Sequence, residues 1–249
     1  MSKLTLSKQK MNFEICVSSP VDVALAQEAG ADRVELCGHW ECGGLTPTPA
    51  SVRASATIGI PVRALIRPRA GSFVYNASEK QLIIAEALDC LDAGAEMVVV
   101  GGLDEFGHVD ENLIEMLCER ISSEIMVFHR ALDLSTHPLE SAKVLQDFGI
   151  NKVLSSGGAP AAGLGLGLLG DLTKLGMEVI AGGGVRLEDI TALGEAGVEA
   201  VHASCRLKTL TNTVTNVADG LFDLSTYPVD FDKALLLSDG VLKWNEYES

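Results

Sequence analysis

The chain has 249 residues, 47% of them hydrophobic and 21% charged, which is enough apolar material for one large domain or two small ones. Its 34 acidic residues against 19 lysines and arginines give a formal net charge of −15. A field of this sign repels phosphate backbones and anionic headgroups, so we expect no nucleic acid and no membrane as partners. Residues 1–17 have no sustained apolar segment of the secretory type, and we expect a cytoplasmic protein.

Short apolar segments alternate with amphipathic helical patterns along most of the chain. The predicted strands are residues 12–17, 33–37, 61–69, 96–103, 124–133, 152–158, 178–185 and 200–205. Eight strand–helix repeats in a chain of this length match a (β/α)8 TIM barrel in number and size. We therefore predict a single α/β domain over residues 1–249, with the eight strand units at about 12–206 and an irregular loop plus a C-terminal helix at 207–249. A doubly wound open sheet is the alternative.

Two segments depart from this rhythm. The sixth helical segment, residues 162–176, carries Gly163, Gly165, Gly167 and Gly170, and each glycine costs about 1 kcal/mol relative to alanine inside a helix. We expect a loop there and then a short helix. Three of these glycines have the GxGxxG spacing, but no strand directly precedes them, so they do not indicate dinucleotide binding. The second segment follows Cys205 and continues to about Val229, and it is rich in Thr, Asn and Asp. Only residues 230–244 after it again have a helical pattern, and they would form the eighth helix.

Charged side chains occur within segments that should be apolar barrel strands. Inward and outward residues alternate along a strand, and an unpaired buried charge costs several kcal/mol, so an inward charge is either paired or serves a site. If the charged sets face inward, Glu14, Glu35, Arg67 and His202 become neighbours, and His129 lies across the barrel. Near the C-terminal face such a cluster would be catalytic. The alternative is a structural ion network in which each glutamate binds an arginine.

Glycine-rich residues follow the seventh predicted strand. The sequence AGGGVR occupies residues 181–186, and HASCR ends the eighth strand unit. Loops after these two strands commonly bind phosphate in TIM barrels, and glycine permits close backbone approach to an anion. Gly183, Gly184, Ser204 and Arg206 are therefore candidate anion ligands. The alternative is that the glycines only allow a tight turn.

A series of motifs, in the same order and spacing, resembles the CutC family of copper homeostasis proteins. The motifs are NFEICV, AGADRVELC, GGLTPT, LIRPRAGSFVY, VFHRALD, KVLSSG, GGGV and HASCR, over roughly residues 12–206. The resemblance implies a TIM barrel, a cytosolic location, copper handling and a homo-oligomer, a dimer or tetramer. It also implies a shared polar site, made of Glu14, Glu35, Arg67, Arg69, His129, Arg130, Asp133 and His202. We add Ser156, from the KVLSSG motif, to the ligand-binding residues.

Six cysteines are dispersed along the chain without a CxxC pair, which is typical of free thiols in a reducing compartment. By the resemblance, Cys16 and Cys37 occupy family-type positions, and we predict them as ligands of Cu(I), a soft ion that prefers sulfur. The alternative is that these small side chains only pack in the core. The loop residues His39 and Cys42 are local additions.

The sequence departs from the family at residues 67–73, which read RPRAGSF where RPRGGDF is usual. An acidic group is therefore missing near the third loop, at the position of Ser72.

Two functions follow from these observations. The first is a cytosolic copper homeostasis protein that binds Cu(I) through cysteines at the barrel mouth. The second is an enzyme that acts on a small anionic or phosphorylated metabolite at the C-terminal face. In the enzyme, Arg67 and Arg69 would hold the anion, while Glu14 or Glu35, together with His129, would exchange protons in the reaction. Whether the protein is an enzyme stays open, as does a third possibility, a barrel that binds a partner and has a purely structural polar core.

Overall fold

The computed structural model describes residues 10–210 and 225–247. Eight parallel strands close into a barrel in chain order, and the last strand pairs with the first. The prediction of a (β/α)8 TIM barrel is confirmed, and this closure excludes the open sheet. The strands are β1 Asn12–Val17, β2 Arg33–Leu36, β3 Val62–Leu65, β4 Met97–Val100, β5 Met126–Phe128, β6 Lys152–Ser155, β7 Glu178–Gly182 and β8 Ala200–Ala203.

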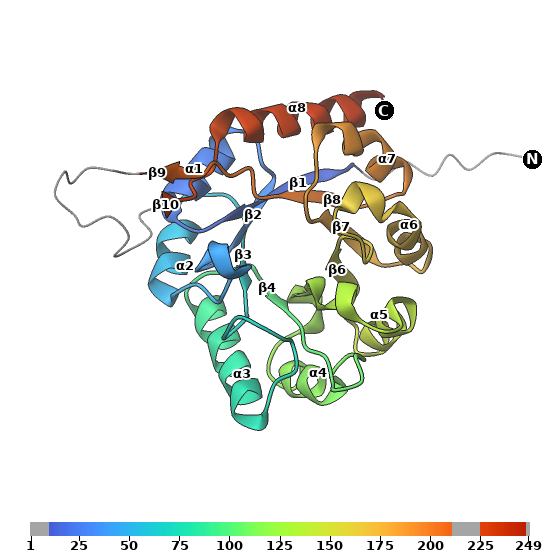
Figure 1. Cartoon of the computed structure of the whole chain (residues 1–249). Coiled ribbons are helices and arrows are strands. Elements are labelled where there is room, and N and C mark those ends of the chain that lie inside the picture. The colour runs from blue at the N-terminus through green and yellow to red at the C-terminus, as the bar shows by residue number, and fades with distance from the viewer. Residues whose placement is uncertain (1–9, 211–224, 248–249) are drawn as a thin grey trace, which may run out of the picture.

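Helices surround the barrel, as Figure 1 shows in a view along the barrel. They are α1 Pro20–Glu28, α2 Pro49–Ala56, α3 Ala77–Asp92, α4 Glu111–Cys118, α5 Pro138–Asp147, α6 Leu166–Lys174, α7 Ile190–Glu195 and α8 Phe231–Tyr247. Polar side chains begin several of them: the Ser19 hydroxyl accepts from the Asp22 N–H at the start of α1, and Asn76 with Glu79 forms a capping box on α3. No helix of the described residues is both long and apolar enough to cross a bilayer.

The glycine-rich segment and the segment after Cys205 were the two departures from the regular strand–helix pattern. Of the irregular loop predicted at 207–229, residues 211–224 lie outside the described part of the chain. The glycine-rich segment is a loop with a single 3₁₀ turn, Ala162–Leu164, and α6 starts only at Leu166. The helical pattern near the C-terminus is α8, which packs against α7, β1 and α1 and completes the ring of helices. Before α8, the short strands β9 Thr209–Leu210 and β10 Ser225–Thr226 pair with each other.

Two apolar layers stabilise the barrel. The larger layer lies between the strands and the helices, and a smaller cluster fills the interior. Each strand unit contributes one residue to the interior cluster, namely Cys16, Cys37, Leu65, Val99, Val127, Leu154, Ile180 and Ala200. The register of neighbouring strands places Glu14 beside His202, and Cys16 beside Glu35. Because residues at one level of a parallel sheet point to the same face, these polar side chains gather at the mouth of the barrel.

Candidate functional site

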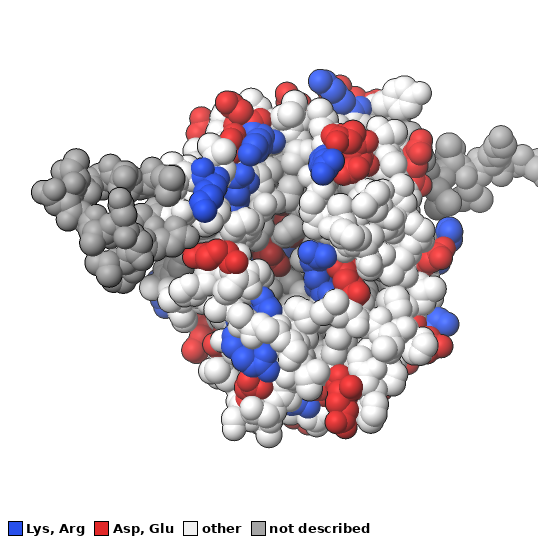
Figure 2. Space-filling model, in the orientation of Figure 1, with Lys and Arg blue, Asp and Glu red and all other residues white. Residues whose placement is uncertain are grey.

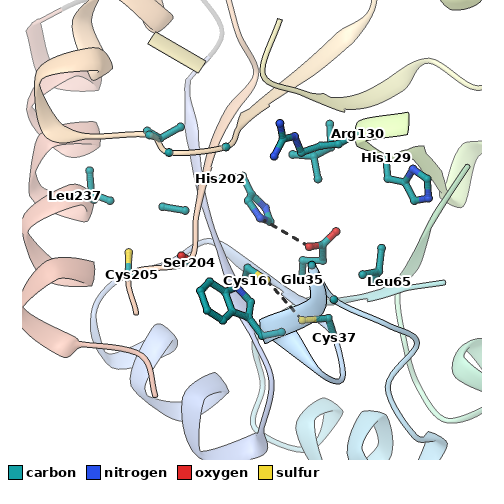
Figure 3. Close-up of a pocket in the computed structure, with 18 of the residues that line it drawn as sticks. Cys16, Glu35, Cys37, Leu65, His129, Arg130, His202, Ser204, Cys205 and Leu237 are labelled. Atoms are coloured by element: carbon teal, nitrogen blue, oxygen red, sulfur yellow. Dashed lines mark hydrogen bonds and ion pairs between the residues drawn. The ribbon is translucent and has the colours of Figure 1, made fainter. Parts of the chain in front are cut away.

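A cavity of about 510 Å³ opens at the C-terminal ends of the strands. This is the face on which TIM-barrel active sites are built. Figure 3 shows His202 and Glu35 near the middle of the site, with Cys16 and Cys37 beside them and His129 at one side. Ten of the predicted residues line the cavity: Cys16, Glu35, Cys37, Arg67, His129, Arg130, Gly183, Gly184, His202 and Ser204. Five do not: Glu14, Arg69, Asp133, Ser156 and Arg206.

The Sγ atoms of Cys16 and Cys37 lie 3.7 Å apart. Both residues are buried, and they come from the adjacent strands β1 and β2. The hydrogen bond to Cys37, together with burial, raises the pKa of the Cys16 thiol well above its usual range. With metal–sulfur bonds of about 2.3 Å, the length found in zinc sites, two sulfurs at this separation can bind one ion. The pair therefore fits a thiophilic ion such as Cu(I), which would displace the thiol protons.

A third group with metal-binding atoms adjoins the thiols. One donor atom each from Cys16, Glu35 and His202 lie within 4.8 Å of one another, and this is the single such cluster in the described part of the chain. Imidazole nitrogen is also an acceptable ligand for copper. Glu35 and His202 are thus candidate further ligands beside Cys16, and His202 would bind through Nε2 only after that nitrogen had lost its proton.

Glu14 lies beneath the cavity, where it binds three cationic groups. Its Oε2 accepts from Arg33 Nε at 2.6 Å and from Arg63 Nη1 at 3.1 Å, and its Oε1 lies 2.7 Å from Nδ1 of His202. Burial alone would raise the pKa of Glu14, but the His202 hydrogen bond and the two arginines hold it well below its usual range. For Glu14 the ion-network alternative therefore describes the geometry, and the carboxylate orients His202 rather than facing the cavity.

His202 lies between two carboxyl groups. Its Nε2 is 3.7 Å from Glu35 Oε2, on the side away from Glu14. Burial lowers the pKa of His202, but hydrogen bonds with Cys16 and Glu14 and the charges of both glutamates raise it well above its usual range. Burial raises the pKa of Glu35, whose Oε1 has no hydrogen-bond partner among the described residues. The site thus combines an imidazole and a carboxyl group that both hold their protons more readily than usual.

His129 provides a buried, neutral imidazole at the other side of the cavity. Its Nδ1 accepts a hydrogen bond from the Ala131 N–H at 3.2 Å, so the proton of the neutral ring is on Nε2. Burial, aided by the charge of Arg67, lowers the pKa of His129 to about 3. Nε2 has no partner among the described residues. Gly101 on the neighbouring strand unit leaves room for the ring, because a Cβ there would lie 2.6 Å from it.

Arg67 and Arg69 do not match the prediction that they hold an anion. Arg67 lines the cavity, but its Nη1 donates to the carbonyls of residues 42–44 and its Nη2 donates to the carbonyl of Gly71. Arg69 lies outside the cavity, paired with Glu79 and bound to the carbonyls of Ser72 and Val74. Both guanidinium groups therefore fix loop geometry. A sequence cannot show this, because the partners are backbone carbonyls of adjacent loops.

Arg130 lines the cavity because β5 ends at Phe128, and a 3₁₀ turn starts at Arg130 itself. Its Nε donates to Asp133 at 2.8 Å, and its Nη2 donates to the Ser156 hydroxyl at 3.0 Å. Asp133 also accepts from the hydroxyl groups of Ser155 and Ser156 and from the N–H of Gly158. Asp133 and Ser156 therefore position Arg130 and do not line the cavity.

Arg206 was predicted as an anion ligand, but it is buried beside the cavity and does not line it. Its Nη2 donates to the Cys16 carbonyl at 3.2 Å, its Nη1 binds the Tyr227 carbonyl, and the group stacks on Trp40 at 5.1 Å. These contacts hold the guanidinium group beside the cavity and not in its lining. Ser204 and the two glycines of the 183–184 loop line the cavity, and their role as anion ligands stays a prediction.

The sequence did not indicate some of the lining residues. Helix α8 contributes Lys233, Leu236 and Leu237, and the segment after β7 contributes Val185, Arg186 and Leu187. The loop after β2 contributes the aromatic side chain of Trp40. The amphipathic pattern of residues 230–244 is a signal for a packed helix, but it does not tell which part of that helix reaches the barrel mouth.

The family model and the related sequences that match this chain all point to one family. A family model described as the CutC family matches residues 11–207. A CutC family protein of Serratia proteamaculans is 38% identical over 198 residues, which is 78% of each chain. A CutC family protein of Pectobacterium atrosepticum is 39% identical over 196 residues, which is 77% of each chain.

Solved structures agree with the fold. A crystal structure of a candidate copper homeostasis protein CutC from Streptococcus agalactiae is 26% identical, with a TM-score of 0.70, and the match covers 78% of this chain and 98% of that one. The thiamine phosphate pyrophosphorylase of Pyrococcus furiosus is 14% identical, with a TM-score of 0.57, over 95% of this chain and 98% of that one. The second likeness concerns the barrel fold alone.

Proposed function

The chain belongs to the CutC family, as its sequence motifs indicated, and on this basis we propose that it is a copper homeostasis protein that binds Cu(I) through Cys16 and Cys37. The observation that carries the proposal is the 3.7 Å separation of the two thiols at the barrel mouth. Copper is the cargo here, held by the two sulfurs. The Streptococcus agalactiae relative, described as a candidate copper homeostasis protein, supports the same role. A cytoplasmic location is part of this proposal.

The proposal predicts one tight Cu(I) site that needs both thiols. We expect the Cys16→Ser, Cys37→Ser double variant to lose at least about 100-fold in affinity, because serine oxygen is a hard ligand and replaces both soft sulfurs. The measurement is an anaerobic Cu(I) titration against a competing chelator.

Cys42→Ser is the matched control, since Cys42 is exposed and its thiol donates only to a loop carbonyl. It should bind Cu(I) like the wild type. Equal and weak binding by all three proteins would contradict the proposal, and so would loss of the site in Cys42→Ser alone.

A second candidate function is an enzyme acting on a small anionic metabolite in the same cavity. The observation that favours it is a pair of buried polar atoms without partners among the described residues, Glu35 Oε1 and His129 Nε2, both on cavity-lining residues. Cu(I) binding by two thiols needs neither atom. Glu35 would exchange a proton with the substrate, and the His129 N–H would donate to a substrate oxygen. Incubation of a small-molecule cell extract with wild type and Glu35→Gln, followed by mass spectrometry, tests this. A compound consumed by the wild type alone is the expected result, and identical extracts would reject the candidate.

A further inference from the structure

The cavity has an apolar side that copper binding does not use. Val185, Leu187, Leu236 and Leu237 line it, from the loop after β7 and from α8. Leu236 and Leu187 are 53% and 41% exposed, which is unusual for large apolar side chains at the rim of a polar site. Leu187 is close to α8, because a Cβ at Gly240 would lie 2.5 Å from its Cδ1. The two elements therefore form one apolar wall, suited to the hydrocarbon part of a ligand.

Arg130 lines the same cavity, with its guanidinium group beside Gly183 of the loop after β7. Asp133 and Ser156 bind Nε and Nη2, whereas Nη1 has no partner among the residues that the structure describes. Gly183 has a φ of +101°, and a Cβ at this position would lie 3.0 Å from Nη1, so only glycine allows the arginine to take this place. A guanidinium held on two sides with one free N–H edge is preorganised for an oxyanion.

The charges at the rim favour the same class of ligand. The lining residues include Arg67, Arg130, Arg186 and Lys233 but one carboxylate, Glu35, whereas acidic residues dominate the chain as a whole. Figure 2 shows both Lys or Arg and Asp or Glu side chains beside the central hollow of this face. Arg186 and Lys233 have acidic neighbours at 3.7 and 4.0 Å, but these pairs are exposed and therefore weak. The residues that line the cavity therefore include more cationic than acidic groups, in contrast to the chain as a whole.

We infer that the cavity binds a small amphiphilic organic anion, with its oxyanion head group at Arg130 and its hydrocarbon body against the wall of Val185, Leu187, Leu236 and Leu237. The unpartnered Nε2 of His129 provides a second donor for an oxygen of the same ligand. The inference rests on the cavity of the enzyme candidate and gives that candidate a ligand class. If the probes bind but no substrate is turned over, the enzyme candidate is rejected and the ligand site is retained.

The test uses four probes that separate the head group from the body: hexanoate, hexyl phosphate, hexanamide and inorganic phosphate. Binding to the full-length wild type is measured by isothermal titration calorimetry at millimolar concentrations. We expect hexanoate or hexyl phosphate to bind more tightly than both hexanamide and inorganic phosphate, because only the former two carry both parts. The stronger of the two identifies the head group. No preference for the amphiphilic anions over the other two probes would overturn the inference.

Variants place the ligand in this cavity. Arg130→Gln removes the charge and should weaken binding of the better probe roughly 10- to 100-fold, the range for hydrogen bonds to charged groups. Arg69→Gln is the matched control, an acid-paired arginine outside the cavity, and should bind like the wild type. Leu236→Glu changes an exposed residue and should also abolish binding, which covers the case that Arg130→Gln fails to fold. Unchanged binding by Leu236→Glu would overturn the inference.

The Cys16→Ser, Cys37→Ser variant separates this inference from copper binding. Both thiols line the same cavity, but Arg130 and the apolar wall are unchanged in this variant, so it should still bind the better probe more tightly than hexanamide and inorganic phosphate. Loss of probe binding in this variant would contradict the inference, whatever the copper titration shows.

Discussion

At the scale of single residues, Glu14 has the clearest physical role. Its carboxylate lies against Arg33, Arg63 and His202, and all four groups are buried. Removing one partner from a buried ion network leaves the others without compensation, which costs much more than the network itself contributes. Glu14 therefore maintains both the charge and the orientation of His202, the imidazole closest to the thiols.

The Glu14→Gln variant should lose about 3–5 kcal/mol of unfolding free energy, because three cationic groups stay buried around a neutral amide. Urea denaturation at neutral pH measures this loss. Asp171→Asn is the control, since its pair with Lys174 is exposed, and it should change the unfolding free energy several-fold less. Similar losses of unfolding free energy in the two variants would show that the buried Glu14 network stabilises the fold no more than an exposed ion pair does.

His129 makes stability depend on pH. Its pKa is about 3 in the folded chain against an ordinary value of 6.5, so between these values the unfolded chain binds a proton that the folded chain does not. Unfolding is then favoured as the pH falls from 6.5 toward 3, by about 1.4 kcal/mol per pH unit. His202 adds no slope there, since its raised pKa leaves it protonated in both states below 6.5.

His129→Gln should remove this part of the slope. Between pH 4.5 and 6.5, above the ordinary pKa of Glu14, its unfolding free energy should fall less steeply than that of the wild type. Urea titrations of both proteins at several pH values give the two slopes. Parallel slopes would mean that His129 is protonated in the folded state.

The strand alternation of the sequence predicted which polar residues face the barrel interior, and this holds for Cys16, Glu35, His129 and His202. The bonding of Arg67 and Arg206 could not be predicted, because acceptors such as the carbonyls of Gly44 and Cys16 are distant in sequence. A periodic pattern gives the direction of a side chain in a regular strand. It does not give the partners that irregular segments supply.

At the scale of elements, the strands and helices were predicted where their patterns were regular. The end of β5 was not, since the predicted strand continued through the residues that form a 3₁₀ turn after His129. This early end brings Arg130 to the cavity. The contribution of α8 also depends on packing, because its place beside α7 follows from closure of the ring and not from any local signal.

The contact between α7 and α8 can be tested by substitution of Gly194 in α7, with Gly167 in α6 as the comparison. Alanine at Gly194 would overlap the indole ring of Trp244 on α8, and we expect Gly194→Ala to lose about 1–3 kcal/mol of unfolding free energy by overpacking. Gly167 in α6 has no atom near its Cβ position, so Gly167→Ala should gain up to about 1 kcal/mol from helix propensity. Thermal or urea unfolding distinguishes the two. A gain in both variants would mean that Trp244 can move without cost.

At the scale of the whole molecule, length and rhythm were sufficient to predict the barrel, because few folds accommodate eight strand–helix repeats in a chain of this length. The formal net charge of −15 did not indicate that cationic residues line the cavity. These residues come from distant parts of the chain, and a net charge does not show where individual charges lie in the fold.

The assembly state is a further expectation at this scale. We expect a dimer or tetramer, as the family resemblance implies, and large apolar side chains such as Phe106 and Leu134 are more than 60% exposed. The loops that carry them are joined by the hydrogen bond from the Thr136 N–H to the Gly107 carbonyl. Light scattering coupled to size-exclusion chromatography should give a multiple of the 26.3 kDa chain mass. A mass of one chain would contradict the expectation.

The two thiols at the barrel mouth are separated by 21 residues, the length of one strand, one helix and their turns. Metal-binding cysteines are usually sought as pairs two or three residues apart, within a single loop. In a parallel barrel, successive repeats bring equivalent strand ends side by side, so the natural interval between two ligands is a whole repeat. Searches for thiol sites in such folds should therefore align the strand–helix repeats and look for cysteines at equivalent strand ends of neighbouring repeats.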